Sequence, residues 1–492
     1  MRKDLDNNTG RQLHHRLRRR TATMYTTRPR TSSHTSIYAV VVFLCLSCCV
    51  RGAQSFVITP KEWDFLQKHN VGYEVAKPIM NNAAAQNNNC SDTSLSAAAA
   101  ADGVPIDSPA AAASTPILLL NGFGVGSFHQ HRLIERLFAT PASSTSSPTT
   151  PSSISPQHKS TVYCMDYLGQ GRSWPKQCQD GQSINEQGLQ YSAELWVQQI
   201  ITFIEDIIQP SELEQAEDLG SDKQRVSTTK VHIVGNSVGG HLAAYVAARR
   251  PDLVESIVLL NPTPVWGLNL PGWTGHLPPP AIPKFIGRFL FDRIRDLKTI
   301  ESFLKETYSR REAFTDELMH QIRGCTLGDG GHAAFASIMW SPPLQVQRDD
   351  SNKDSNNSNK RKRGDGGNFQ DCLVKVSCDV LLVFGKDDPW CKPAFAKKMM
   401  NALDQREPSK VHRYVEISNA GHCPNHEAPT AVSHLLRSWT GALDDRRSST
   451  LTLFDETPKI FEEDWGHHSV QECGANEIQV GFMDRLATTF VS

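Results

Sequence analysis

The sequence predicts an α/β fold in which a mostly parallel central sheet carries helices on both faces and holds an inserted helical cap. Strand-like apolar runs alternate with helical stretches, an alternation typical of α/β folds with right-handed crossovers. One apolar run, from residue 231, passes through Gly-x-Ser-x-Gly directly into an Ala-rich helical stretch that ends at residue 250. Residues 264–348 break the alternation, because they are Pro-rich, then helical and rich in aromatic residues, as an inserted cap would be.

The expected strands are short runs of nearly continuous hydrophobicity. Such runs favour strands that are buried on both faces, as in a parallel sheet. They are Ile117–Leu120, Val162–Met165, Val231–Val234, Ile257–Leu260, Val380–Phe384 and Tyr414–Ile417.

Two segments between these strands have the periodicity of amphipathic helices. Their apolar residues recur every three or four positions, so each helix presents one apolar stripe to the sheet. The stripes are Trp196, Ile200, Phe203, Ile204 and Ile207 in the first helix, and Val432, Leu435, Leu436 and Trp439 in the second.

Composition divides the chain into a core with several insertions. Four polar or low-complexity stretches cannot bury enough apolar area to offset the cost of ordering their backbone, so we expect disorder at 81–115, 139–160, 210–229 and 349–368. The expected organisation is a leader at 1–55, an N-terminal extension with a linker at 56–115, a core at 116–263 and 376–442, a cap at 264–348, a disordered insertion at 349–375 and a C-terminal tail at 443–492.

The N-terminus has the pattern of a targeting leader. An Arg-rich region precedes an apolar run, Ile37–Val50, and small residues follow at 53–55. The run is too short to span a bilayer comfortably, which favours a cleaved signal over an anchor. Because Phe56 would become the new N-terminus, the leader resembles the bipartite plastid leader of algae with complex plastids. Its Arg-rich region is unusually long, so Met24 is an alternative start.

Charge and cysteine spacing exclude several classes of function. Of the 492 residues, 1–55 hold ten Lys/Arg and two Asp/Glu, which leaves 41 basic against 50 acidic residues in the remainder. An acidic body argues against a nucleic-acid partner. The nine cysteines outside the leader include no Cys-x-x-Cys pair, and no other metal-ligand spacing occurs, so we expect neither a metal nor a cofactor.

The Gly-x-Ser-x-Gly segment makes Ser237 the candidate nucleophile. In a turn this sharp the positions two residues before and after the serine must lack side chains, and Gly235 and Gly239 meet that need. A serine hydroxyl needs a base to attack at neutral pH, and the base needs an orienting carboxylate. In this arrangement the acid and the base follow the serine in that order, each after a strand.

The candidate acid and base lie after the last two expected strands. Asp388, three residues after the glycine of Gly-Lys-Asp-Asp-Pro-Trp, is the candidate acid, and the neighbouring Asp387 is the alternative. His422, in Ala-Gly-His-Cys-Pro, is the candidate base, and His426 lies one turn further on.

Two backbone N–H groups are expected to form the oxyanion hole. One belongs to Val238, directly after the nucleophile, and the other to Phe123, in the Gly-rich loop after the first core strand. The motif Asp166-x-x-Gly-x-Gly-x-Ser follows another strand, and we assign it a structural role.

Several segments together resemble the pheophytinase and chlorophyll dephytylase branch of the α/β-hydrolase superfamily. The resemblance covers about residues 116–439 and rests on Gly-Asn-Ser-Val-Gly-Gly around Ser237, on Asn-Pro-Thr-Pro-Val-Trp-Gly from Asn261, on Phe-Ala-Ser-Ile-Met from Phe335, and on the two motifs around Asp388 and His422. The triad motifs are general to the superfamily, whereas the second and third segments are more specific to this branch. The chain departs from the branch at Val238, where Leu is usual, and in its long polar insertions. Enzymes of the superfamily commonly have His where Asn121 stands.

The resemblance implies the α/β-hydrolase fold and a plastid enzyme, in the stroma or at the thylakoid surface, that releases phytol from pheophytin or chlorophyll through an acyl-enzyme. It also implies a peripheral contact with the thylakoid membrane. A phytyl chlorin ester is large and apolar, so it needs a broad apolar pocket. We expect this pocket to involve Trp266, Trp273, Phe335 and Trp340, with Phe285, Phe289 and Phe291 as further aromatic residues of the cap.

Three other functions remain compatible with the same motifs. They are a carbon–carbon bond hydrolase of ring-cleavage products, a lipase or thioesterase, and a ligand receptor with little turnover. Epoxide hydrolases and dehalogenases of similar fold need an Asp where Ser237 stands, which disfavours both.

Overall fold

A computed structural model describes twelve segments of the chain. They are residues 56–66, 69–79, 114–139, 159–175, 189–218, 229–263, 281–328, 331–340, 344, 346, 369–444 and 458–478. The chain divides into two compact units, Met1–Gln54 and Ser55–Ser492, and every described residue belongs to the second. The leader, Met24 and most of the expected linkers therefore lie outside the described residues.

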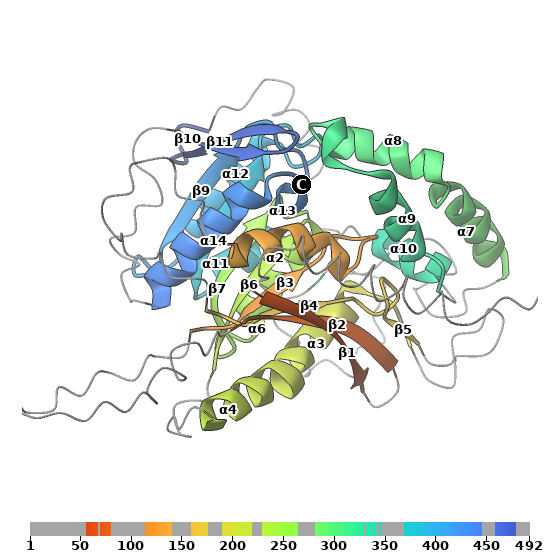
Figure 1. The fold of residues 1–492 in the computed structure, drawn as a ribbon, viewed down its shortest axis with the longest axis horizontal. Helices are drawn as coiled ribbons and strands as arrows, with labels where there is room; N and C mark the ends of the chain where they lie inside the picture. The colour runs from red at the N-terminus through yellow and green to blue at the C-terminus, as the bar shows by residue number, and fades with distance from the viewer. Residues whose placement is uncertain are drawn as a thin grey trace, which may run out of the picture. The chain divides into compact units, whose positions relative to one another are not determined.

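The described strands form one sheet in the order β1-β2-β4-β3-β6-β7-β8-β9-β11-β10, with β5 paired to β2 (Figure 1). The six central strands from β4 to β9 are parallel. They are β3 (Ile117–Leu120), β4 (Val162–Met165), β6 (Val231–Asn236), β7 (Val254–Leu260), β8 (Asp379–Gly385) and β9 (His412–Ile417). Each contains one of the expected runs, and together they confirm the predicted mostly parallel sheet.

Antiparallel strands extend both edges of this parallel core. β1 (Phe56–Phe65) pairs with β2 (His69–Pro78), which pairs with β4 and with the short β5 (Trp174–Pro175). At the other edge, β11 (Gly466–Glu472) pairs with β9 and with β10 (Lys459–Glu463). None of these strands is predicted from the sequence: β1 and β2 fall in the expected N-terminal extension, β5 in the expected core, and β10 and β11 in the expected C-terminal tail.

Helices cover both faces of the sheet, because successive residues of a buried strand point to opposite sides. On one face of the sheet, Leu118 and Leu120 of β3 share a core cluster with α3, α6, α11 and α12. On the other face, Ile117 and Leu119 share a core cluster with α2 and α14. These helices are α2 (His131–Phe138), α3 (Ala193–Phe203), α6 (Val238–Arg249), α11 (Phe369–Val374), α12 (Pro393–Leu403) and α14 (Pro429–Asp444).

Four further helical segments complete this part of the fold in the described residues. They are the 3₁₀ turn η1 (Ser127–Gln130), the π-helical segment η3 (Ile204–Ile208), α4 (Gln209–Asp218) and α13 (Pro424–Glu427). No helix in the described segments is both long enough and apolar enough to cross a bilayer.

The inserted cap lies between β7 and β8 in the sequence and has a small core of its own. Its helices are α7 (Ala281–Ile294), α8 (Leu297–Thr307), η4 (Arg311–Ala313), α9 (Asp316–Gly324) and α10 (Gly331–Trp340). Ile300 and Leu304 of α8 pack with Phe314, Leu318 and Met319, so α8 and α9 form one cluster. Figure 1 draws the cap in green, beside the carboxyl ends of the central strands.

Two of the expected disordered stretches contain helices. In 210–229, the first nine residues belong to α4, which continues α3 through η3 and is rich in residues that favour helix. Glu212 of α4 accepts a hydrogen bond from the Tyr163 hydroxyl at 2.8 Å. In 349–375, α11 buries Phe369, Cys372 and Leu373 in the core cluster that it shares with α6 and α12, so the expectation of disorder is wrong for residues 369–375.

Candidate active site

Ser237 occupies a sharp turn between β6 and α6. Its backbone has φ 55° and ψ −120°, a strained conformation for a residue with a side chain. A Cβ on Gly235 would collide with the backbone of Gly239, and a Cβ on Gly239 would lie 2.7 Å from the carbonyl oxygens of Leu120 and Asn121. The two glycines therefore allow the turn, as the motif indicates.

A hydrogen-bonded chain links the three residues that the sequence selects. The Ser237 Oγ lies 2.8 Å from Nε2 of His422, and Nδ1 of His422 lies 2.6 Å from Oδ2 of Asp388. All three side chains are buried, so water competes little for their hydrogen bonds. The alternative acid, Asp387, instead accepts a hydrogen bond from the Ser309 hydroxyl at 2.6 Å.

Asp388 is held as an anchored carboxylate. Its Oδ1 accepts hydrogen bonds from the backbone N–H groups of Trp390 at 2.7 Å and Cys391 at 3.0 Å. Burial opposes ionisation of Asp388, but the hydrogen bond and the charge of His422, helped by these two N–H groups, outweigh burial and lower its pKa. The carboxylate is therefore ionised at neutral pH and fixes the orientation of the imidazole ring.

Asn261, at the end of β7, is a further residue of this network. Its side-chain amide donates to Oδ2 of Asp388 at 2.5 Å and to the carbonyl oxygen of Gly421 at 3.0 Å, and its Oδ1 accepts from the N–H of Gly385 at 2.8 Å. In the sequence, Asn261 stands out only as part of a segment that carries the family resemblance. The signal that points to a role is its position after a central strand, next to the strands that carry Ser237 and Asp388.

The loop around His422 is fixed from two sides. The side chain of Asn236, next to the nucleophile, donates to the carbonyl oxygen of His422 at 2.9 Å, and the N–H of His422 donates to the carbonyl oxygen of Thr307 at 2.8 Å. Thr307 ends α8 of the cap. The ring of His426 stacks on the ring of His129 with 4.6 Å between centroids, and its Nδ1 lies 3.0 Å from the Tyr308 hydroxyl. His426 is therefore not part of the hydrogen-bonded triad.

The loop after β3 lies over the nucleophile. A Cβ on Gly122 would lie 3.4 Å from that of Ser237, and both Phe123 and Val238 line the cavity in front of the serine. The side chain of Gln170 accepts a hydrogen bond from the N–H of Gly124 at 2.8 Å and so holds this loop. Gln170 occupies a variable position of the Asp166 motif, so the motif does not predict this role.

Asp166 and Asn121 anchor the base of the same loop. Asp166 accepts hydrogen bonds from the N–H groups of Ser127 at 2.6 Å and Arg172 at 3.0 Å. Asn121 donates to the carbonyl oxygen of Met165 at 3.2 Å and accepts from Gln130 at 3.1 Å. Neither residue lines the cavity. Their hydrogen bonds instead fix the loop that carries Phe123.

A cavity of about 470 Å³ opens in front of Ser237 and His422. The cap supplies much of its wall, and most of the lining is apolar. The cap residues that line it include Phe291, Ile294, Ile300, Phe303, Leu304 and Phe335. The volume lies in the range of small-molecule sites, and the lining suits an apolar substrate.

Only some of the expected pocket residues line the cavity. Phe335 lines the cavity and contacts the rings of Phe123 at 5.6 Å and Phe291 at 5.7 Å. Phe285 and Phe289 are exposed on the outer side of α7 and do not line it, which corrects the expectation for both. Trp266, Trp273 and the side chain of Trp340 lie outside what the structure describes.

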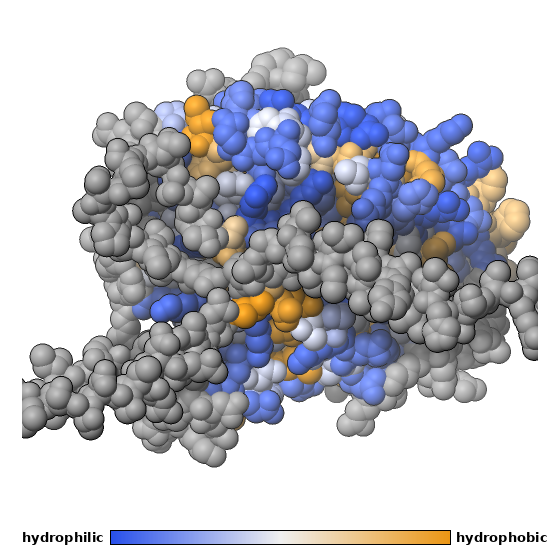
Figure 2. All heavy atoms as spheres, viewed as in Figure 1, coloured by the Kyte–Doolittle hydropathy of each residue, from blue (hydrophilic) through white to orange (hydrophobic). Residues whose placement is uncertain are grey.

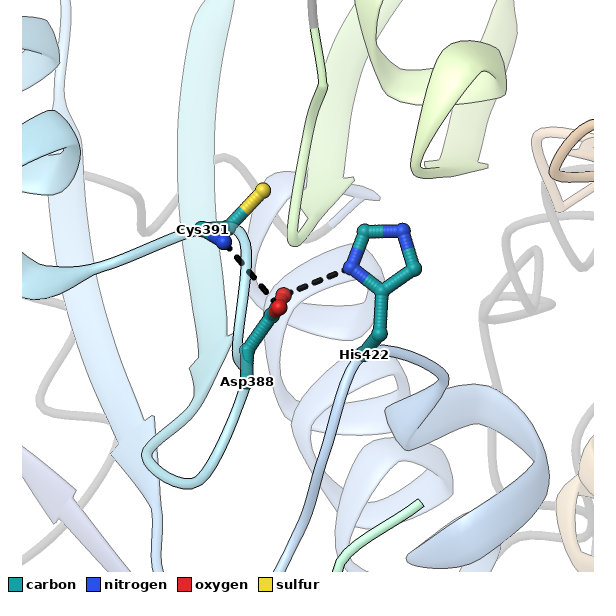
Figure 3. Close-up of side chains that lie close together, drawn as sticks. All are labelled: Asp388, Cys391 and His422. Carbon is teal, nitrogen blue, oxygen red and sulfur yellow. Dashed lines mark hydrogen bonds and ion pairs between the residues drawn. The ribbon is translucent and has the colours of Figure 1, made fainter. Parts of the chain in front are cut away.

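Asp388, Cys391 and His422 are close enough together to compare with a metal site (Figure 3). Burial raises the pKa of the Cys391 thiol well above its ordinary value. Figure 3 shows the Asp388 carboxylate between the Cys391 backbone and the His422 ring. The chemistry of this group is that of a carboxylate that orients a histidine.

Comparisons with known proteins identify a family and several similar proteins. Residues 117–435 match the model of the family described as "Alpha/beta hydrolase family". The chloroplastic pheophytinase of Arabidopsis thaliana is 28% identical over 400 residues, which cover 73% of this chain and 66% of that protein. A pimeloyl-[acyl-carrier protein] methyl ester esterase of Neisseria meningitidis is 26% identical over 249 residues, which cover 49% of this chain and 67% of that protein.

The chain thus spans about two thirds of the length of each of these relatives. Among solved structures, a membrane phospholipase A described as a bacterial virulence factor is 15% identical, with a TM-score of 0.44 over 83% of this chain and 99% of that chain. Because the family match covers most of the sheet, the Ser237 turn and the His422 loop, this chain belongs to the alpha/beta hydrolase family.

Proposed function

We propose that this hydrolase cleaves a carboxylic ester by a Ser–His–Asp acyl-enzyme mechanism, and that its substrate is pheophytin or chlorophyll, from which it releases phytol. The observation that carries the proposal is that the hydrogen-bonded triad of Ser237, His422 and Asp388 opens into an apolar cavity of about 470 Å³. A polar reaction centre at the end of an apolar cavity suits an ester whose two halves are both apolar.

In the proposed first step the Oγ of Ser237 attacks the ester carbonyl carbon while Nε2 of His422 accepts the hydroxyl proton. Asp388 keeps the ring in the tautomer with the proton on Nδ1 and stabilises the imidazolium that forms. The carbonyl oxygen becomes negative in the tetrahedral intermediate. The N–H groups of Phe123 and Val238, which both line the cavity, are the proposed donors to this oxygen.

The intermediate then expels the alcohol. His422 returns its proton to the leaving phytol oxygen, the carbon–oxygen bond breaks, and the chlorin acid stays on Ser237 as an ester. Water enters, His422 accepts one of its protons, and the hydroxide attacks the acyl carbon. Collapse of this second intermediate restores the Ser237 hydroxyl and releases the chlorin carboxylic acid, so atoms and charge balance.

Two observations support the chlorin substrate. The relative from Arabidopsis thaliana is a chloroplastic pheophytinase, and the match to it covers 73% of this chain. The aromatic rings of Phe123, Phe291 and Phe335 contact one another along the cavity, which offers flat apolar surface near the serine.

A second candidate is hydrolysis of a smaller carboxylic ester. The similarity to a methyl ester esterase favours it, although that match covers only 49% of this chain. The two candidates use the same triad and differ in what fills the cavity.

One preparation tested on three substrates separates these candidates. We expect the purified chain to release phytol from pheophytin, from chlorophyll, or from both, with a kcat/KM above that for a short acyl ester. Cleavage of the short ester alone would contradict the chlorin proposal and leave the esterase mechanism. If all three esters stay intact while a chlorin binds tightly, the chain is a receptor on a hydrolase fold.

We also propose that the protein acts in a plastid. The support is the leader pattern at residues 1–55 and the chloroplastic relative. A fusion of residues 1–55 to a fluorescent protein is expected to enter plastids, and a fusion in which Ile37–Val50 is deleted is expected to stay outside. Import of both fusions, or of neither, would contradict the proposed leader.

A further inference from the structure

The outer side of α7 carries an apolar stripe that nothing in the described part of the chain covers. Its residues recur with the spacing of an amphipathic helix face that would normally be buried. Their exposed fractions range from 51% to 74%, and they are Ile282, Phe285, Ile286, Phe289 and Leu290. We call this set the α7 stripe. Figure 2 shows apolar side chains at the edge of the molecule where Figure 1 draws α7, with hydrophilic residues around them.

The opposite side of the same helix forms part of the cavity wall. Phe291 and Ile294 line the cavity, and Phe291 also contacts Phe335 of α10. Phe303 of α8 lines the cavity too and is itself 47% exposed. One helix therefore separates the cavity that contains Ser237 from an exposed apolar surface, and that surface lies close to the cavity lining.

The segment around the stripe is basic, although the chain as a whole is not. Residues 281–298 contain five Lys/Arg and two Asp, whereas the whole chain has a net charge of −1. Asp292 is paired with Arg295, and the guanidinium of Arg293 lies over the ring of Phe289 at 5.5 Å, at the margin of the stripe. Exposed aromatic and aliphatic residues bordered by Arg and Lys characterise helices that lie in the plane of a membrane surface.

We propose that α7 docks this protein on the surface of a bilayer that contains anionic lipids. The stripe would enter the boundary between head groups and acyl chains, and Arg293, at the margin of the stripe, would reach the lipid phosphates. The cavity would then lie directly above the bilayer, so that an apolar substrate could pass into it without crossing water. The docking itself does not depend on the proposed chemistry.

Charge favours a bilayer over a second copy of this chain. Self-association through the stripe would bring two basic segments together, and like charges at an interface cost free energy. An anionic bilayer supplies the complementary charge and can also take up the exposed rings of Phe285 and Phe289. A protein partner with an acidic apolar groove is the other occupant, and in that case the parent would bind vesicles no better than the test variant.

The test measures binding to lipid vesicles rather than turnover. It uses Ser55–Ser492, the compact unit that contains all described strands, with Ser237→Ala, so that no ester is cleaved and the apolar leader makes no contribution. Vesicles are phosphatidylcholine alone, or phosphatidylcholine with about one third phosphatidylglycerol. The test variant is Phe285→Asp with Phe289→Asp. The matched control is Val57→Asp with Ile460→Asp, two apolar residues with comparable exposure on the edge strands β1 and β10.

We expect the parent and the control to bind anionic vesicles, and the test variant to bind at least about tenfold more weakly. Arg288→Gln with Arg293→Gln is expected to weaken binding severalfold at low salt, with a smaller difference at high salt.

Equal binding of parent and test variant would overturn the proposal. So would a dimer of the parent that the test variant splits without any change in vesicle binding, because the stripe would then be a self-interface. Equal thermal unfolding of all variants confirms that they fold, and Phe285→Ser with Phe289→Ser replaces the test variant if it does not.

Discussion

The backbone N–H of His422 donates a hydrogen bond to the carbonyl oxygen of Thr307, 2.8 Å away. Thr307 is the last residue of α8, so this bond joins the loop of the proposed base to the cap. The buried carboxyl of Glu427 strengthens the link, because it accepts from the N–H of Gly421 at 2.8 Å and from the N–H of Arg310 at 3.0 Å. The cap therefore does more than enclose the cavity: it also fixes the position of His422.

This link predicts a pH-dependent stability that comes from Glu427. Burial raises the pKa of Glu427 from an ordinary value of 4.5 to about 7. The hydrogen bonds from the N–H groups of Gly421 and Arg310 lower this pKa but do not outweigh burial. The folded state thus holds the proton more tightly than the unfolded state. The stabilisation is complete below about pH 4.5 and is lost as the pH rises to about 7, a change of about 3 kcal/mol at most. Unfolding in urea at about pH 5 and about pH 8 measures it.

The matched variants are Glu427→Gln and Glu462→Gln, the latter at an exposed position of β10. Glu427→Gln should remove this pH-dependent part of the free energy of unfolding, whereas Glu462→Gln should retain it. The same pH dependence in both variants would show that Glu427 is not the group responsible.

Asn261→Ala is expected to reduce activity without abolishing it. The change removes a donor to Asp388, a donor to the Gly421 carbonyl and an acceptor for Gly385, so the acid and the base loop lose a common support. A small displacement of a reacting group can cost about 10²-fold in rate, and we expect a loss of kcat/KM of about 10- to 100-fold. Steady-state kinetics on the best ester measures it.

Asn401→Ala, at an exposed position of α12, is the control for this substitution and should behave as wild type. If Asn261→Ala kept full activity, the network around Asp388 would not depend on its amide.

Gly239→Ala should destabilise the fold. A Cβ at this position would lie 2.7 Å from two carbonyl oxygens of the neighbouring loop, so β3 or α6 must shift. Overpacking of this kind typically costs about 1–3 kcal/mol. Gly441→Ala is the control, since a Cβ there meets nothing within 4 Å in α14 and should stabilise the helix by about 0.5–1 kcal/mol. Thermal unfolding of the two variants should shift in opposite directions, and equal shifts would contradict the packing argument.

Gln170→Ala is expected to lower kcat more than it raises KM. Its side chain holds the N–H of Gly124, next to the proposed oxyanion donor Phe123, and this donor matters most when the carbonyl oxygen becomes negative. We expect kcat to fall about tenfold. Gln405→Ala, at an exposed turn just after α12, is the control. An increase in KM alone would indicate that the loop binds substrate and does not act on the transition state.

The sequence predicts the parallel core well because its strands are buried on both faces. Runs such as Val380–Phe384 are apolar at every position, so they can be identified without knowledge of their neighbours. The edge strands could not be identified in this way. In β1 only Trp63 and Phe65 are buried, and in β10 only Phe461 and Glu463, because these strands face solvent along most of their length.

The proposed catalytic residues follow strands or a glycine motif, so local pattern selects them. The supporting residues do not have such a pattern. Asn261 and Gln170 act through partners more than 40 positions away in the chain, and Glu427 acts on a cap loop more than 100 positions away. The cavity wall depends on how the cap helices turn, which is why Phe291 and Phe335 line it while Phe285 and Phe289 do not.

The most direct test of the central claim is phytol release from pheophytin by wild type and by Ser237→Ala, measured by chromatography of the products. Ser211→Ala, a remote serine on α4, is the control and should retain full activity. If Ser237 is the nucleophile, its replacement lowers the rate by about 10³-fold or more while the protein still folds. Undiminished phytol release by Ser237→Ala would contradict the account.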